Sequence, residues 1–285
     1  MRYVAPSTLE EASAFLVDAN GNGRVLAGGT DLLVQLRAGM ANPDTIVDVK
    51  HIDELMTIKE EADGMRIGAA VCGQAMGEHA GLNNTWPGLV EATELIGSTQ
   101  VQGRASAGGN LCNASPAADS VPAMIAAGAM VTVYGPDGHR ELAVENFATA
   151  PGKTNLKEGE LITSIKLPKP AERSGDAYLR MTPRTEMDIA IVGLGVALTL
   201  DGEGTVTAAR VGLGAVAPTA MLVKEAGDAL VGSKLDDEAL ERAAEACRKA
   251  CNPINDKRGT IEYRTKIAGV LLKRVAKIAA ERAGS

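Results

Sequence analysis

Two short segments of the sequence have the composition of an anion-binding loop. Residues 27–31 (AGGTD) and residues 106–110 (SAGGN) each place two adjacent glycines between a small residue and a polar one. Glycines leave the backbone N–H groups unobstructed by Cβ atoms, and adjacent N–H groups form a concave nest for a phosphate or pyrophosphate. A double glycine alone is more often a plain tight turn. The hypothesis therefore depends on the pair, since two such nests can grip one dinucleotide.

Two other glycine patterns imitate nucleotide-binding motifs without satisfying them. Gly152-Lys153-Thr154 ends like a phosphate-binding loop, but the leading glycine would fall on Phe147. Residues 212–217 (GLGAVA) fit a loose dinucleotide pattern, yet a proline follows them and they lie far from the N-terminal third of the chain, where such a unit normally begins. Neither pattern predicts a nucleotide site.

The cysteines and histidines predict neither a metal site nor a catalytic side chain. Cys72, Cys112, Cys247 and Cys251 are too few for a disulfide framework and are not clustered like zinc or iron–sulfur ligands. Cys247 and Cys251 are four residues apart in a helical pattern, but ordinary packing is favoured because no third ligand is near. The three histidines are scattered, and the chain offers no obvious nucleophile–base pair.

Local patterns predict the elements that hold the two glycine segments. Ser7 and Thr8, followed by two glutamates, form a capping box that begins a helix. Val25-Leu26 predicts a strand that runs into residues 27–31, and a helix follows it. The second segment is expected to be another glycine loop, followed by a short helix with Asp119 at or near its cap.

The rest of the chain alternates between the two kinds of element. Asp63-Gly64 supplies a turn for a hairpin between strands at 46–49 and 65–69, and residues 201–204 join strands at 189–200 and 206–216. Residues 169–176 have the proline, glycine and charged residues of a linker. Strands are predicted at 46–49, 65–69, 130–134, 161–167, 189–200 and 206–216, and helices at 82–96, 235–251 and 261–283.

Bulk composition argues against several classes of partner. The net charge of -7, the absence of a Lys/Arg block and the 2% aromatic content disfavour nucleic-acid binding. The first 16 residues mix charges into apolar positions, unlike a signal peptide, and no run approaches the roughly 18 apolar residues of a membrane span. We expect a cytoplasmic protein with no membrane span and no nucleic-acid partner.

The glycine segments, together with motifs further along, resemble the FAD-binding subunit of the xanthine dehydrogenase and carbon monoxide dehydrogenase family, the molybdenum hydroxylases. The matches follow in the expected order over nearly the whole chain, at residues 113–119 (NASPAAD), 184–190 (RTEMDIA), 214–219 (GAVAPT) and 258–264 (RGTIEYR).

The resemblance implies an α+β fold with three parts. A two-lobed FAD-binding domain of the vanillyl-alcohol-oxidase/PCMH type would comprise residues 1–57 (lobe 1) and 58–172 (lobe 2). Residues 177–285 would form a small C-terminal domain like that of the CO dehydrogenase flavoprotein, with an antiparallel sheet and helices.

The same resemblance implies the cofactor contacts. The two glycine segments would line the FAD pyrophosphate, and Asp119 would accept hydrogen bonds from ribityl or ribose hydroxyls. Ile96 stands where the long animal members carry an aromatic ring, so it can pack on the flavin but cannot stack with it; Arg180 stands where they carry lysine. The implied FAD-binding residues are Leu26, Ala27, Gly28, Gly29, Thr30, Asp31, Leu32, Leu33, Ile96, Ser106, Ala107, Gly108, Gly109, Asn110, Asp119, Ile162 and Arg180.

By this resemblance the chain is an oxidoreductase subunit that transfers electrons and leaves substrate oxidation to a partner. The molybdenum cofactor and the two-iron, two-sulfur clusters would lie on a large molybdopterin subunit and a small iron–sulfur subunit, in a dimer of heterotrimers. Electrons would pass from the clusters through FAD to NAD, a quinone or oxygen. Two alternatives remain: a free-standing FAD-dependent reductase similar to the UDP-N-acetylenolpyruvylglucosamine enzyme, and a non-catalytic binding module that would purify without yellow colour.

Overall fold

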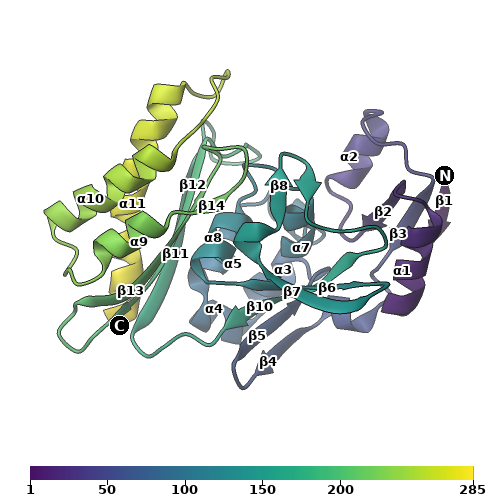
Figure 1. Ribbon diagram of the computed structural model, residues 1–285, viewed down its shortest axis with the longest axis horizontal. Helices are drawn as coiled ribbons and strands as arrows, with labels where there is room; N and C mark the ends of the chain where they lie inside the picture. Colours follow the sequence, from purple (N-terminus) through teal and green to yellow (C-terminus); the bar gives the residue numbers. More distant parts are fainter. Residues whose placement is uncertain (285) are drawn as a thin grey trace.

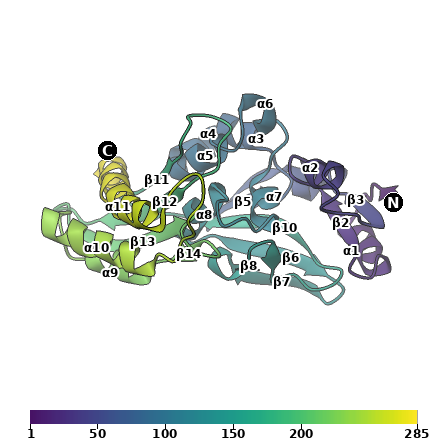
Figure 2. The ribbon, with the colours of Figure 1, turned by 90° about the horizontal axis from the view of Figure 1, so that it is seen from above.

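The computed structural model describes residues 1–284, which fold around three main sheets (Figures 1 and 2). The first sheet lies at the end of the molecule that holds the N-terminus, and the third lies at the other end, beside the last helices (Figure 1). The second sheet lies between them. The α+β fold expected from the sequence is confirmed.

The first sheet is parallel and has the strand order β1-β3-β2. Helix α1 begins as predicted, because the Thr8 hydroxyl accepts the N–H of Glu11 at 3.2 Å and the Glu11 carboxylate accepts the N–H of Ser7 at 2.9 Å. The elements are β1 (Arg2–Val4), α1 (Leu9–Asp18), β2 (Gly23–Leu26), α2 (Leu32–Arg37) and β3 (Thr45–Asp48).

The second sheet is antiparallel, with the order β4-β5-β10-β6-β7. The predicted hairpin partner of β5 was wrong: β5 turns back on β4, whereas β3 belongs to the parallel sheet. The sequence of β4, Ile-Lys-Glu-Glu, is too polar to stand out as a strand. The strands are β4 (Ile58–Glu61), β5 (Gly64–Gly68), β6 (Met130–Gly135), β7 (Gly138–Ala143) and β10 (Leu161–Pro168), and β8 (Ala148–Ala150) pairs separately with β9 (Lys153–Thr154).

Short helices occupy the long connection between β5 and β6. The predicted helix over residues 82–96 is divided at Pro87, which starts the second of its two helices. The helices are α3 (Gly73–Glu78), α4 (Ala80–Thr85), α5 (Pro87–Glu94), α6 (Thr99–Gln102), α7 (Ala107–Cys112) and α8 (Ser120–Ala126). Outside this connection, single 3-10 turns precede β4 (Asp53–Met56) and follow β7 (Val144–Asn146).

The third sheet, in the order β11-β12-β13-β14, is antiparallel and packs between two helical layers. Helices α5 and α8 pack on it from the second-sheet side, and the C-terminal helices cover its other side (Figure 2). The predicted linker at 169–176 is shorter than expected, because β11 begins at Ser174. The elements are β11 (Ser174–Met181), β12 (Val192–Leu200), β13 (Val206–Gly214), β14 (Met221–Leu222), α9 (Lys224–Leu230), α10 (Asp237–Ala250) and α11 (Ile261–Gly284).

Two hydrophobic cores support this arrangement. One runs continuously from α1 through the second sheet to α8, and the other lies between the third sheet and helices α9 to α11. Among the helices of residues 1–284, none combines the length and apolar character needed to cross a membrane.

Candidate functional site: a cofactor cleft between the first two sheets

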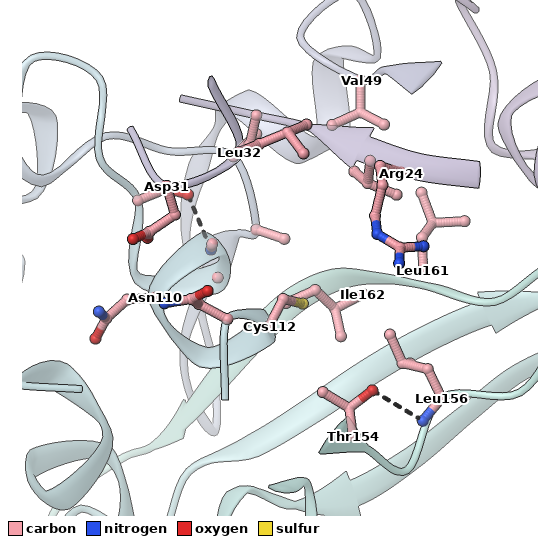
Figure 3. A pocket seen from close by; sticks show the side chains of 18 of the residues that line it. Arg24, Asp31, Leu32, Val49, Asn110, Cys112, Thr154, Leu156, Leu161 and Ile162 are labelled. Carbon is pink, nitrogen blue, oxygen red and sulfur yellow. Dashed lines mark hydrogen bonds between the residues drawn. The ribbon is translucent and has the colours of Figure 1, made fainter. Parts of the chain in front are cut away.

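A cleft of about 550 Å³ opens between the first sheet and the second, and both glycine segments line it (Figure 3). Its volume lies within the range typical of small-molecule and cofactor sites, roughly 300–1,000 Å³. Apolar side chains form much of its floor, with Val49 on one side and Leu156, Leu161 and Ile162 on the other.

The first glycine segment is a true loop between β2 and α2. Gly29 has a φ of +79°, a left-handed conformation that glycine adopts without a steric penalty. Gly28 is required for a different reason: a Cβ atom there would lie 1.8 Å from the carbonyl oxygen of Arg104. Within residues 1–284, the N–H groups of residues 28–31 donate to no protein acceptor. They are therefore available to a ligand.

The second glycine segment is not a loop, contrary to the prediction. Its glycines form the first turn of α7, and the Ser106 hydroxyl caps the helix by accepting the N–H of Gly109 at 3.0 Å. Gly108 packs closely on Ala69, the residue that follows β5. A Cβ atom on Gly108 would lie 2.3 Å from the Ala69 carbonyl oxygen. The N–H group of Gly108 has no acceptor in the described chain, as expected at a helix start.

Two polar contacts hold the walls of the cleft together. The Arg104 side chain donates to the Gly28 carbonyl at 3.4 Å, and the Gln35 amide of α2 donates to the Asn113 side chain at 3.1 Å. Gln35 and Asn113 line the cleft, although the sequence analysis did not identify them. Gln35 lies one turn after the first segment and Asn113 directly after α7, so a search of the flanking helical turns would have found both.

The structure brings most of the predicted FAD contacts together. Leu26 and Leu33 pack on Gly29 and lie outside the lining, and Ala107, the first residue of α7, is buried and also lies outside it. The predicted residues that line the cleft are Ala27, Gly28, Gly29, Thr30, Asp31, Leu32, Ile96, Ser106, Gly108, Gly109, Asn110 and Ile162.

Asp119 and Arg180 pair with each other instead of lining the cleft. Arg180 donates to the Asp119 carboxylate at 2.7 Å, and the Tyr178 hydroxyl donates to it at 2.9 Å. Burial raises the pKa of Asp119 to about 6, although both partners act in the opposite direction.

Asp119 occupies the N-cap position of α8, as predicted from the sequence. Its backbone is helical and its side chain makes no capping bond. The Asn110 side chain takes that place, accepting the N–H of Ser120 at 3.3 Å and its hydroxyl at 2.7 Å. Since Asn110 lines the cleft and Ser120 follows Asp119, the buried pair is one residue removed from the cleft wall.

The remaining lining residues include charged and titratable groups that the sequence analysis did not select. Arg24 of β2 and Lys157 both line the cleft. Arg24 extends over it toward Leu161 and Ile162 (Figure 3). Asp31 adds a carboxylate whose pKa is raised by burial. Burial also raises the pKa of the Cys112 thiol to about 12, so it stays protonated and unreactive.

These residues fit a dinucleotide. Both glycine segments line the cleft and carry unpaired N–H groups that a pyrophosphate can use, and apolar side chains beside them suit a ring system. In the described part of the chain, no group of three or more His, Cys, Asp or Glu residues is arranged to hold a metal ion.

Comparison with known families identifies this architecture. Residues 1–170 match the family model of the FAD binding domain in molybdopterin dehydrogenase, and residues 177–279 match the CO dehydrogenase flavoprotein C-terminal domain. The chain belongs to this FAD-binding family of molybdenum hydroxylase subunits. It is therefore an FAD-dependent oxidoreductase component.

Relatives of this flavoprotein subunit match along almost its entire length. The carbon monoxide dehydrogenase medium chain of Afipia carboxidovorans is 35% identical over 99% of this chain and 97% of its own. A putative xanthine dehydrogenase FAD-binding subunit of Escherichia coli is 30% identical with the same coverage, 99% and 97%.

Solved structures agree with this assignment. A chain of the Cu,Mo-CO dehydrogenase superposes with a TM-score of 0.95 at 34% identity, covering 99% of this chain and 98% of that one. A chain of quinoline 2-oxidoreductase from Pseudomonas putida 86 superposes with a TM-score of 0.92 at 28% identity, covering 100% and 98%.

Proposed function

We propose that this flavoprotein subunit relays electrons between a partner iron–sulfur subunit and an external acceptor, while a partner molybdopterin subunit oxidises the organic substrate. The observation that carries the proposal is the cleft, which is lined by two glycine segments, one after β2 and one at the start of α7, that carry unpaired backbone N–H groups. Bound FAD would accept electrons singly and release them in pairs to NAD, a quinone or oxygen.

The residues of this chain supply binding, orientation and electrostatics. The N–H groups of residues 28–31 and of Gly108 would hold the pyrophosphate, with Arg24 and Lys157 of the cleft lining adding positive charge. Ile96 and Ile162 would pack on the ring system and exclude water from it. These roles are binding and positioning, and none of them requires a proton-transfer group.

The placement of the cysteines supports iron–sulfur clusters on a separate subunit. A cluster of this type is held by four cysteine thiolates. Of the four cysteines in the sequence, Cys112 lines the cofactor cleft and Cys247 is buried in the C-terminal core.

We propose that this chain, the small iron–sulfur subunit and the large molybdopterin subunit assemble as a dimer of heterotrimers in the cytoplasm.

Affinity purification of the tagged chain from its native host tests this function. We expect two further chains to copurify, with flavin, iron and molybdenum in the preparation and a mass equal to two of each chain. Recovery of a homogeneous, active, flavin-containing single chain would overturn the subunit assignment in favour of a free-standing reductase. A colourless preparation that does not take up FAD would overturn flavin binding itself.

A further inference from the structure

Helix α5 is capped by a residue from the third sheet. Trp86 occupies the capping position of α5 but offers no side-chain cap. The carboxylate of Asp176, on β11, accepts the N–H groups of Gly88 and Leu89, each at 3.1 Å. Asp176 is only 3% exposed, and a carboxylate at this place also interacts favourably with the helix dipole. The start of α5 is therefore fixed by the C-terminal part of the chain.

A second contact holds the middle of the same helix. Arg282 of α11 donates to the Glu91 carboxylate at 3.1 Å and to the backbone carbonyl of Asp176 at 2.8 Å. The packing is close, because a Cβ atom on Gly88 would lie 2.6 Å from the Asp176 carboxylate and 2.7 Å from the Cα atom of Ala177. We call Asp176, Arg282 and Glu91 the α5 clamp.

The opposite end of α5 reaches the cofactor cleft. The helix ends at Glu94, and Ile96, two residues later, lines the cleft. The N–H of Ile96 donates to the Thr93 carbonyl at 3.1 Å, so a hydrogen-bonded turn ties Ile96 to the end of the helix. A helix of this length spans about 12 Å. A rigid shift of α5 at its start would therefore displace Ile96.

We propose that the α5 clamp positions Ile96 against the cofactor, so that the C-terminal sheet and helix set the shape of one wall of the FAD cleft. The inference rests on the proposed FAD-binding function of the cleft. Asp176 and Arg282 are positioning residues, because they act through α5 and do not line the cleft. A purely structural clamp would stabilise the fold without changing FAD affinity.

Titration of the flavin-stripped full-length chain with FAD tests the clamp. We expect Asp176→Asn and Arg282→Gln each to weaken FAD binding roughly 3- to 30-fold, the usual range for residues that couple through packed elements. Trp86 is the sole tryptophan of the chain, is buried and stands at the N-cap of α5, so its emission should move to longer wavelength in both variants.

Matched controls separate the clamp from general destabilisation. Asp201 also accepts two backbone N–H groups, from Glu203 and Thr205, but in the turn between β12 and β13. Arg242 forms an exposed ion pair on α10. Asp201→Asn and Arg242→Gln should leave both FAD affinity and Trp86 emission unchanged.

Double variants decide whether the effect passes through Ile96. In an Ile96→Ala background, Asp176→Asn should weaken FAD binding much less than it does alone. Additive effects, or unchanged affinity in folded clamp variants, would overturn the clamp while leaving FAD binding intact. Should Asp176→Asn fail to fold, Glu91→Gln supplies the same comparison. Failure of the unmodified chain to bind FAD would overturn the proposed function itself.

Discussion

The two glycine segments of the cleft expose their backbone N–H groups through different conformations. Residues 27–31 form a loop whose direction depends on the left-handed Gly29, whereas residues 106–110 cap and begin helix α7. The loop relies on curvature to make its N–H groups converge, and the helix relies on the alignment of its first turn. The two segments thus have similar compositions and both leave the backbone unobstructed, but one does so as a loop and the other as the first turn of a helix.

The segments also share a requirement that concerns packing and not the ligand. In each, the first glycine lies against a backbone carbonyl, that of Arg104 for Gly28 and that of Ala69 for Gly108. These glycines are needed for the chain to close around the cleft before any cofactor is bound.

The largest expected effect tests this shared requirement. Gly28→Ala and Gly108→Ala would force a methyl group into a backbone carbonyl, and we expect each to lower the free energy of unfolding by more than about 3 kcal/mol. Urea denaturation measures the loss. Gly202→Ala is the control, because a Cβ atom there meets no atom within 4 Å. If Gly28→Ala were as stable as the unmodified chain, the packing of the two cleft walls would not depend on the close approach of Gly28 to the Arg104 carbonyl.

The second prediction concerns the α5 clamp, which supports the wall of the cleft at Ile96. The loop at residues 27–31 does not use this support. Burial raises the pKa of Asp176 to about 6 from its usual 3.8. The folded chain therefore holds this proton more tightly than the unfolded chain, and the stabilisation is complete below about pH 4 and lost as the pH rises through 6.

Comparison with Asp176→Asn isolates this contribution. Between pH 4 and pH 7 we expect the unfolding free energy of the unmodified chain to fall by about 2 kcal/mol relative to the variant. Backbone hydrogen bonds lower the pKa of Asp201 from its usual 3.8, so its contribution is lost only at lower pH, and Asp201→Asn should parallel the unmodified chain between pH 4 and pH 7. Parallel pH profiles for the unmodified chain and Asp176→Asn would contradict the assignment.

The third prediction separates the loop from the helix. Gly29→Ala places a side chain at φ +79° and should cost about 1–2 kcal/mol. Gly109→Ala lies inside α7, where alanine favours the helix by up to about 1 kcal/mol, partly offset by its contact with the Ser106 hydroxyl at 3.0 Å. Thermal unfolding should rank Gly109→Ala as the more stable of the two. The reverse order would mean that the second segment behaves as a loop.

The smallest expected effect concerns the two capping positions. Ser106→Ala removes a hydrogen-bonded cap and should cost about 1 kcal/mol. Asp31 holds the corresponding position at α2 without a side-chain capping bond, so Asp31→Ala should change stability by less than about 0.5 kcal/mol. Chemical denaturation of both variants provides the comparison, and equal losses would remove the distinction between the two helix starts.

Features encoded by neighbouring residues were predictable, and those set by distant contacts were not. The capping box of α1 and the hairpin β12–β13 follow from local sequence. Two glycines disfavour helix α7, which forms because Gly108 fits against Ala69, thirty-nine positions earlier in the chain. The pairing of β3 with β1 and β2 likewise depends on crossovers that no local pattern specifies.

The site shows the same division. The glycine segments were predicted as cleft residues because their composition carries the chemistry, and the structure places both there. Asp119 and Arg180 were placed at the cofactor by family pattern, whereas the folded chain pairs them with each other and gives the helix-capping role to Asn110. Which polar groups satisfy one another is decided by tertiary packing, and a sequence pattern does not contain that information.

The first sheet forms no strand pairing with the other sheets of the described chain, and side-chain links such as Gln35–Asn113 and Ser13–Gly159 join it to them. A ligand that binds between the first sheet and the rest of the chain, at a free concentration of 100 times its dissociation constant, stabilises the folded chain by about 2.7 kcal/mol. A bound cofactor would therefore strengthen the contact between the first sheet and the rest of the chain, which otherwise rests on side-chain packing and on these hydrogen bonds.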